Sequence, residues 1–189
     1  MDSFVYFAYG SNMLTERLRA RCPSAEPIGT AYARGYKICF EKKSKKDKSG
    51  KATLMSRDSN SDKIHGLLFQ INKSELGLLD RVEGKDSGYY RDDWFPVTST
   101  ENGNILSVTY IAEELVRGLS PFDWYLALIV AGAMQHELPK EYIECLRVVE
   151  TTRDVNSKTI DVREEALKIL KNAGTKYESV YQEIAERAK

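Results

Sequence analysis

The sequence predicts one α+β domain over residues 1–189, in which the strands can curl into a barrel. Two observations carry this prediction. Strand-like apolar runs separated by turn residues fill the first two thirds of the chain, and from Ser120 onward the apolar spacing becomes helical. Strands clustered ahead of helices are typical of α+β folds. A chain of 189 residues is also long enough to bury a substantial core in one domain.

Six runs are predicted to be strands, because apolar residues gather there between turn signals. The first is apolar almost throughout and indicates a buried strand. The last two flank Asn102-Gly103, a pair that favours a tight hairpin turn. In chain order the predicted strands are Phe4–Tyr9, Tyr36–Glu41, Ala52–Ser56, Ile64–Ile71, Tyr90–Thr100 and Ile105–Ala112.

Helices are predicted where apolar residues recur at helical spacing. One follows Asn72, which is spaced from Glu75 as in a capping box, and stops at Gly84. Pro121 marks the start of a buried helix that extends to Met134. Three more helices follow, one in Leu138–Glu150 and then, within residues 151–189, Asp161–Leu170 and Tyr177–Ala188.

Composition is that of an ordinary globular protein and argues against two classes of partner. Hydrophobic residues make up 42% and charged residues 30%, and 28 basic residues balance 28 acidic ones. A neutral chain has no overall field to attract nucleic acid or a membrane surface. The longest apolar run, Trp124–Met134, is far shorter than the ~20 residues of a membrane span. We therefore expect neither nucleic acid nor membrane as a partner.

One local charge run lies between two predicted strands. Lys42–Lys51 contains six lysines but lacks the arginine and aromatic residues that nucleic-acid surfaces usually supply. We expect it to be a solvated, mobile hairpin loop, because charge runs are usually solvated.

Cysteine and histidine usage argues against several kinds of chemistry. Cys22, Cys39 and Cys145 are scattered and form no C-x-x-C pair, so we expect reduced, buried and inert thiols in an intracellular protein. His65 and His136 have no metal-ligating neighbours at useful spacing. No glycine-rich nucleotide motif is present, and no basic-then-apolar leader opens the chain. The sequence thus predicts a cytoplasmic protein with no metal and no nucleotide cofactor.

The first candidate site is the turn that ends the first predicted strand. The apolar run stops at Tyr9-Gly10-Ser11-Asn12, just before a basic, amphipathic segment. Gly and Asn are typical of a tight turn. The same residues also suit a ligand cradle, because bare backbone N–H groups near a helix N-terminus bind anions and carbonyls. Taken alone, this stretch leaves both interpretations open, and tight turns are far commoner.

The second candidate is Glu83, at the end of the helix that Gly84 stops. The negative end of the helix dipole disfavours the charged form of a carboxylate there. Burial among Val82, Tyr89 and Tyr90 would act in the same direction. A carboxylate in such surroundings can take a proton from an amine and hand it on. The alternative is an ordinary solvent-facing glutamate at a helix end, which is common.

Two segments, taken together, resemble the γ-glutamylcyclotransferase family: YFAYGSN (Tyr6–Asn12) and LDRVEG…SGYY (Leu79–Tyr90). They stand in the order and at about the separation found there. The longer stretch YFAYGSNMLTERL is especially close to the animal-type members. Tyr125–Tyr142 is similar to one of their helical segments, with the same Gly-Ala and Leu-Pro landmarks. The resemblance covers roughly Phe4 to Val149, and antibiotic-precursor γ-glutamyl cyclotransferases and AIG2-like proteins are related.

This resemblance implies a small mixed β-barrel surrounded by helices, and an enzyme that needs no cofactor. Members of the family act on a small-molecule γ-glutamyl substrate. The α-amine of the substrate attacks its own γ-carbonyl, which releases 5-oxoproline and a free amine or amino acid. The residues that the resemblance implies are Glu83 as general acid/base, and Tyr9, Gly10, Ser11, Asn12 and Tyr125 as substrate-binding residues.

Several alternatives stay open. The substrate can be a γ-glutamyl amino acid, glutathione, a γ-glutamylamine or a γ-glutamyl-protected antibiotic precursor, and the YGSN form favours the first. A catalytically silent protein that binds a γ-glutamyl compound or a protein partner is the rival to an enzyme, and the presence of Glu83 argues against it. Lys42–Lys51 could also lie over the pocket and select an acidic leaving group. The animal-type enzyme is a homodimer, and the apolar C-terminal half fits either such an interface or a core.

Overall fold

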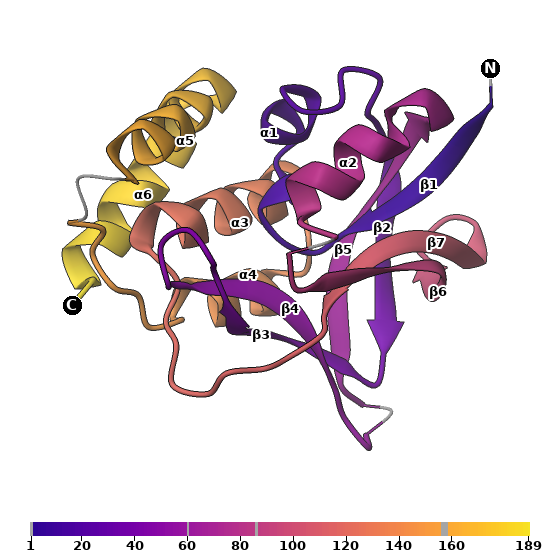
Figure 1. The fold of residues 1–189 in the computed structure, drawn as a ribbon, viewed down its shortest axis with the longest axis horizontal. Coiled ribbons are helices and arrows are strands. Elements are labelled where there is room, and N and C mark those ends of the chain that lie inside the picture. Colours follow the sequence, from indigo (N-terminus) through magenta and orange to yellow (C-terminus); the bar gives the residue numbers. More distant parts are fainter. Residues whose placement is uncertain (1, 60, 86, 156–158) are drawn as a thin grey trace.

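A closed barrel of five strands forms the centre of the computed structural model (Figure 1). The structure describes residues 2–59, 61–85, 87–155 and 159–189. Around the barrel the strands follow the order β1-β5-β2-β6-β7, and a parallel contact between β1 and β7 closes it, whereas the other pairs are antiparallel. The barrel strands are β1 (Ser3–Ala8), β2 (Glu26–Arg34), β5 (Lys63–Asn72), β6 (Tyr89–Ser99) and β7 (Gly103–Ala112). The predicted α+β class and barrel are confirmed.

A separate two-stranded hairpin carries the lysine-rich loop. It consists of β3 (Tyr36–Lys43) and β4 (Gly50–Ser56). Two backbone hydrogen bonds tie its loop end to the segment before the helical half: Gly50 N–H to Ser120 O, 2.9 Å, and Val116 N–H to Glu41 O, 2.7 Å. The strand ends that flank the loop are therefore bonded to the rest of the molecule, whereas the sequence predicted a mobile loop.

All six predicted strands are present, and their bounds differ by at most two residues, but the sequence prediction missed β2. Pro27 and Gly29 interrupt this strand in the sequence, and both residues usually weaken a strand assignment. In the structure they mark a shift in the pairing of β2 with β5. The bulge lets the strand bend into the barrel wall, which a strand pattern alone does not reveal.

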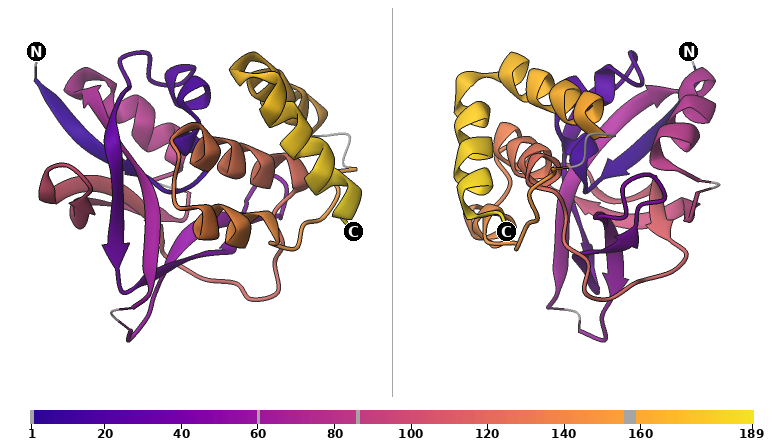
Figure 2. Two further views of the ribbon diagram at one scale, coloured as in Figure 1. Left: turned by 180° about the vertical axis from the view of Figure 1, so that it is seen from behind. Right: turned by 60° about the vertical axis from the view of Figure 1, so that its left-hand side comes forward.

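Helices α3, α4, α5 and α6 gather on one side of the barrel with α3 in their middle, whereas α2 lies apart from them, against the barrel strands (Figure 2). Apolar residues cover α3 all round and nearly all are buried, as expected of a central helix. It packs against α4, α5 and α6 and against the 3₁₀ turn Ser11–Met13 that follows β1. The helices are α1 (Thr15–Arg19), α2 (Leu76–Glu83), α3 (Asp123–Gln135), α4 (Lys140–Arg147), α5 (Ile160–Ala173) and α6 (Thr175–Arg187).

The start of α2 differs from the prediction, whereas its end agrees. The Asn72 side chain makes no capping hydrogen bond. Glu75 instead accepts hydrogen bonds from Ser24, at 3.2 Å from the backbone N–H and 2.7 Å from the hydroxyl, so the capping box is wrong. Gly84 ends the helix with φ +78°, a left-handed conformation that favours glycine. Glu83 is therefore the last helical residue, as predicted.

The three cysteines are free, and they differ in burial. Cys22 is buried, Cys39 is partly buried and Cys145 is exposed. The prediction of three buried thiols is thus wrong for Cys145, which lies on the outer side of α4. No helix among the described residues has the length and apolar character to cross a membrane.

Gly132 lets α3 approach the turn after β1 very closely. A Cβ at this position would lie 2.5 Å from Leu14 N, 2.6 Å from Met13 C and 2.7 Å from Met13 Cβ. Such distances cannot be tolerated without movement, and two of the three neighbours are backbone atoms that cannot swing aside. The absence of a side chain at Gly132 therefore fixes how close the turn lies to α3.

We expect Gly132→Ala to destabilise the protein by about 1–3 kcal/mol and to displace the turn after β1, because the added methyl overpacks this contact. Gly77→Ala is the matched control, since a Cβ there meets nothing within 4 Å and alanine is the better helix former. Urea unfolding of both variants measures the difference. Equal stability of the two would show that the close contact is not required.

Candidate active site

A small pocket lies where β1, the turn after it, α2, β4 and α3 meet. Its volume is about 30 Å³, and we call it the inner pocket. All six site residues expected from the sequence line it, although they come from three separate parts of the chain. The inner pocket is lined by Tyr6, Tyr9, Gly10, Ser11, Asn12, Ala52, Glu83, Tyr89, Tyr110 and Tyr125.

Glu83 is held by two hydrogen bonds to the same carboxylate oxygen. Oε1 accepts one from the Tyr6 hydroxyl and one from Asn12 Nδ2 at 2.6 Å. Burial raises the pKa of Tyr6 well above its usual value, and the neighbouring Glu83 adds to the rise, so this hydroxyl keeps its proton and donates it. Oε2 has no hydrogen-bond partner among the described residues. One oxygen thus fixes the side chain and the other is free to bind a proton.

The amide of Asn12 is oriented by Arg21. Arg21 Nη1 donates to Asn12 Oδ1 at 2.8 Å. A guanidinium carries only donors, so it must face the oxygen of the amide and leave the NH₂ group to face Glu83. Asn12 is 3% exposed and cannot easily rotate away. The chain Arg21–Asn12–Glu83 therefore sets the direction of the hydrogen bond that holds the carboxylate.

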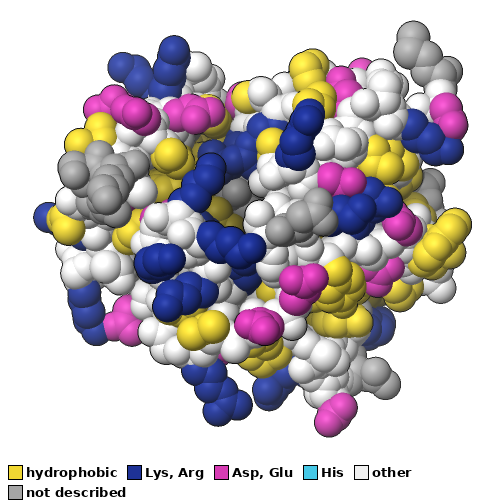
Figure 3. Space-filling model, viewed as in Figure 1, with side chains coloured by type: hydrophobic (Ala, Val, Ile, Leu, Met, Phe, Trp, Pro, Cys, Tyr) yellow, Lys and Arg dark blue, Asp and Glu magenta, His cyan; other side chains and the backbone are white. Residues whose placement is uncertain are grey.

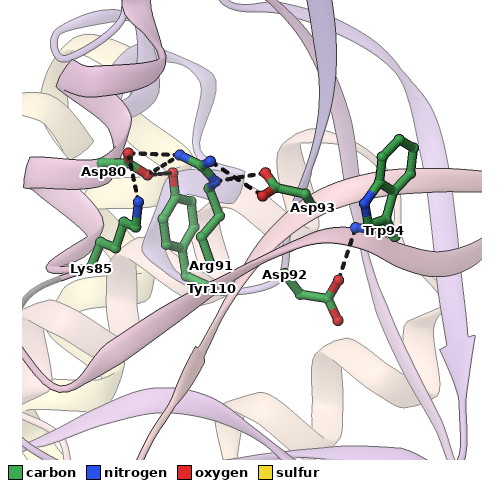
Figure 4. Close-up of polar contacts among 7 residues, drawn as sticks. All are labelled: Asp80, Lys85, Arg91, Asp92, Asp93, Trp94 and Tyr110. Atoms are coloured by element: carbon green, nitrogen blue, oxygen red, sulfur yellow. Dashed lines mark hydrogen bonds and ion pairs between the residues drawn. The ribbon is translucent and has the colours of Figure 1, made fainter.

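Asp80, one turn before Glu83, anchors α2 to the barrel (Figure 4). Its carboxylate accepts hydrogen bonds from Arg91 Nη1 on β6, at 2.9 and 2.7 Å, and from the Tyr110 hydroxyl on β7 at 2.8 Å. Lys85 adds a longer ion pair at 3.6 Å. Leu79 beside it is fully buried. Because these contacts fix the last turn of α2, they also fix the backbone that carries Glu83.

The turn after β1 presents unpaired backbone donors to the inner pocket. No acceptor among the described residues pairs with the backbone N–H groups of Gly10, Ser11 or Asn12, whereas Gly10 O accepts from Met13 N–H at 3.0 Å. This is the usual state of the first N–H groups of a helical turn. The turn therefore offers donors to a ligand, which favours the cradle over the simple turn.

The hydroxyl groups of three pocket tyrosines differ in their hydrogen bonds. The Tyr9 hydroxyl donates to the backbone oxygen of Tyr110, so it is occupied by the fold. The Tyr89 hydroxyl donates to Ala52 O at 2.7 Å. The Tyr125 hydroxyl accepts from Ala52 N–H at 3.2 Å, and its own proton has no acceptor among the described residues. Tyr125 is thus able to donate into the pocket, and Tyr9 shapes the pocket without offering its hydroxyl.

The surroundings of Glu83 differ in part from the prediction. Tyr89 is buried, but Val82 and Tyr90 are exposed at 40% and 44%, so two of the three expected neighbours are wrong. The residues that hold the carboxylate, Tyr6 and Asn12, come from the other motif. Tyr6 belongs to the YFAYGSN motif, so a polar hydroxyl in this apolar strand was the sequence signal for a residue that contacts Glu83.

Nothing in the described part of the chain supplies an activated nucleophile or a metal to this pocket. No group of three or more His, Cys, Asp or Glu among these residues is placed to hold a metal ion. Burial raises the pKa of Cys22 to about 11 and also raises that of Cys39, so neither thiol ionises near neutrality. The Ser11 hydroxyl accepts a hydrogen bond from Arg17 Nε at 3.2 Å and has no base beside it. The arrangement suits proton transfer by Glu83 beside fixed donors.

The chain is similar to known proteins along most of its length. Residues 63–146 match the AIG2-like family. It is 35% identical over 178 residues to the γ-glutamylcyclotransferase of Homo sapiens, which covers 92% of this chain and 91% of that one. The Mus musculus protein of the same name is 33% identical over 171 residues, or 88% and 89%. A solved structure of a γ-glutamyl cyclotransferase superposes with a TM-score of 0.75 at 32% identity and covers 87% of this chain and 99% of that one.

We expect Asp80→Asn to lower the free energy of unfolding by about 1–3 kcal/mol, because it removes a half-buried charge that Arg91 and Tyr110 share. Asp92→Asn is the control, because this partly buried carboxylate accepts one hydrogen bond from the described residues, a solvent-exposed contact from Trp94 N–H at 2.8 Å (Figure 4). Its loss should cost about 0.5 kcal/mol or less. Denaturant unfolding of both variants measures the two losses in the free energy of unfolding. Equal losses would contradict the anchoring role of Asp80.

Proposed function

Because the chain belongs to the γ-glutamylcyclotransferase family, we propose that it cleaves γ-glutamyl amino acids or amides by internal cyclisation, with Glu83 as general acid/base. The α-amine of the substrate attacks its own γ-carbonyl carbon, the C–N bond to the leaving group breaks, and 5-oxoproline and a free amine or amino acid are released. The observation that carries the proposal is the Glu83 carboxylate, fixed through Oε1 and free at Oε2, in the wall of a pocket with unpaired N–H donors.

Glu83 performs both proton transfers in turn. The α-ammonium of the substrate must lose a proton before its nitrogen can attack, and Oε2 accepts that proton. The leaving nitrogen must gain a proton as the C–N bond breaks, and the protonated carboxyl supplies it, so that Glu83 returns to its initial state. The attacking nitrogen loses its second proton as the lactam forms, and the released amine takes up that proton to become an ammonium. Tyr6 and Asn12 keep Oε1 occupied throughout and thereby hold Oε2 toward the substrate. One carboxylate is sufficient because the two transfers occur at neighbouring nitrogens.

The turn after β1 stabilises the negative charge that develops on the γ-carbonyl oxygen. The backbone N–H groups of Gly10 and Ser11 are unpaired in the described structure, so no existing hydrogen bond has to break. The Tyr125 hydroxyl can add a third donor from the other side of the pocket. Donors that are fixed before the reaction stabilise the transition state more than the ground state.

The described residues of the pocket supply no activated nucleophile, which fits a reaction in which the substrate's own amine attacks. The ring closes when the extended γ-glutamyl chain folds back on itself, so the pocket contributes by holding that conformation. Five tyrosines line the narrow inner pocket and restrict its shape: Tyr6, Tyr9, Tyr89, Tyr110 and Tyr125. Neither an activated serine nor a thiolate is then required.

Three narrower expectations stay predictions. They are a cytoplasmic location, a homodimer and a place in glutathione metabolism. The sequence and the family resemblance support each of them. The choice among γ-glutamyl amino acids, glutathione and γ-glutamylamines is decided by assay of each substrate.

We expect Glu83→Gln to lower the rate of 5-oxoproline release by about 10²–10⁴-fold while KM changes little, because the amide still accepts from Tyr6 and Asn12 but cannot carry the proton. Glu75→Gln is the control, since this glutamate contacts Ser24 outside the pocket. The measurement is 5-oxoproline release from γ-glutamyl-alanine by the two variants. A fully active Glu83→Gln enzyme would contradict the proposed role.

We expect Gly10→Val to raise KM for the γ-glutamyl substrate by at least about tenfold, with unfolding little changed. A Cβ at this position would lie 3.5 Å from Ala52 Cβ and 3.8 Å from the Tyr125 hydroxyl, so the fold has room for it, but the added methyl groups would occupy the inner pocket. Steady-state kinetics and thermal unfolding measure the two effects. An unchanged KM would show that the substrate does not approach this turn.

A further inference from the structure

A second and much larger cavity, of about 410 Å³, adjoins the inner pocket, and we call it the outer cavity. Ser11, Glu83, Tyr89 and Tyr125 line both spaces. A substrate whose γ-carbonyl lies beside Glu83 therefore has the outer cavity as the adjoining space for its leaving group. The inference below rests on the proposed function, because it assigns an occupant to this space.

The walls of the outer cavity are strongly basic, although the chain as a whole is neutral. Seven cationic side chains line it, against the two carboxylates of Asp47 and Glu83, as far as the described residues go. Figure 3 shows Lys and Arg side chains gathered around the hollow on this face of the molecule. Positive charge focused in a concave site raises the local concentration of anions.

Arg17 is the most deeply buried of these cations. It is 7% exposed, and it forms no ion pair with any described carboxylate; its Nε donates to the neutral hydroxyl of Ser11. Burial lowers the pKa of Arg17 to about 9, and Arg21 contributes to the decrease, so the side chain is still charged near neutrality. A buried charge without a counter-ion is costly. An anion in the outer cavity would supply the missing counter-ion.

Two lysines of the β3–β4 hairpin are held at the boundary between the two spaces. Lys42 is 8% exposed, and its Nζ lies 4.9 Å from the centre of the Tyr89 ring. Lys51 pairs with Asp47 at 3.0 Å, and its Nζ lies 4.7 Å from the centre of the Tyr125 ring. Lys42 and Lys51 are thus packed against the site, which corrects the prediction of a solvated loop for these two residues, whereas the other four lysines of the segment are exposed as expected.

Lys42 and Lys51 also face one another directly in the hairpin pairing. Like charges opposite each other on neighbouring strands destabilise the pair. Burial lowers the pKa of Lys42, and the charges of Lys45 and Lys51 lower it further, while Asp47 acts in the opposite direction. The β3–β4 hairpin therefore tolerates a repulsion that an anion between the two lysines would relieve.

We propose that the outer cavity binds an acidic leaving group, so that the enzyme prefers γ-glutamyl amides of dicarboxylic amino acids, such as γ-glutamyl-glutamate, over those of neutral amino acids. The α-carboxylate and the side-chain carboxylate of the leaving group would be bound by Arg17, Lys42 and Lys51. A neutral amino acid as leaving group brings only one carboxylate into the outer cavity, so most of the positive charge of the cavity walls stays uncompensated. Glu83 lines both the inner pocket and the outer cavity, and in the proposed function it binds the α-amine of the substrate.

The test compares γ-glutamyl-glutamate with γ-glutamyl-glutamine, which has nearly the same shape but lacks the second carboxylate. We expect kcat/KM for 5-oxoproline release to be about tenfold or more higher for γ-glutamyl-glutamate at low salt. The ratio should fall when NaCl is raised to about 0.5 M, because salt screens charge attraction. Equal values, or a preference for γ-glutamyl-glutamine, would overturn the inference and leave the proposed function standing. Release from neither substrate, and none from γ-glutamyl-alanine, glutathione or a γ-glutamylamine, would overturn both.

Lys42→Gln should lower the ratio of the two kcat/KM values several-fold. This variant removes one of two facing like charges, so the fold should tolerate it. Lys43→Gln is the matched control, because Lys43 is the next residue of β3, is exposed and lies outside the outer cavity. Lys51→Gln provides an independent second variant. A ratio that none of the cavity variants changes would contradict binding of the second carboxylate there.

Discussion

The hydrogen bonds that Tyr6 and Asn12 donate to one oxygen of Glu83 are the interaction on which the site depends. They join the first strand of the barrel and the turn that follows it to the end of α2, which lies more than 70 residues further along the chain. With Oε1 occupied, the free Oε2 can face the substrate. The direction of the Glu83 side chain is thus a consequence of the barrel and not of α2 alone.

Two further contacts keep this geometry rigid. Asp80 fixes the last turn of α2 on β6 and β7 through Arg91 and Tyr110. On the opposite side, Gly132 of α3 admits the turn after β1 to backbone contact distance. The cradle is therefore held between the helical half and the barrel, and the unpaired N–H groups of Gly10 and Ser11 lie in a fixed place. Preorganised donors of this kind are what an oxyanion requires.

Local sequence patterns predicted much of the fold, and the family resemblance supplied the six proposed site residues, for identifiable reasons. Alternating and apolar runs marked six strands, and Gly84 marked the end of α2. The prediction missed β2, because Pro27 and Gly29 hide a bulged strand. It also misplaced the partners of Glu83, choosing the chain neighbours Val82 and Tyr90 over Tyr6 and Asn12. Partners brought together by barrel closure leave no trace in local spacing, whereas motif resemblance placed the site itself. The position of Lys42–Lys51 beside the pocket was only an alternative at the level of the sequence, because a run of lysines does not show which residues it packs against.

The most direct test of the central claim is a crystal structure of the Glu83→Gln variant with a γ-glutamyl amide bound. The account predicts that the substrate's α-nitrogen lies about 2.6–3.2 Å from the side-chain amide at position 83. It also predicts that the γ-carbonyl oxygen faces the N–H groups of Gly10 and Ser11, and that the leaving group extends into the outer cavity. A substrate bound with its α-nitrogen away from position 83, or outside the inner pocket, would contradict the account.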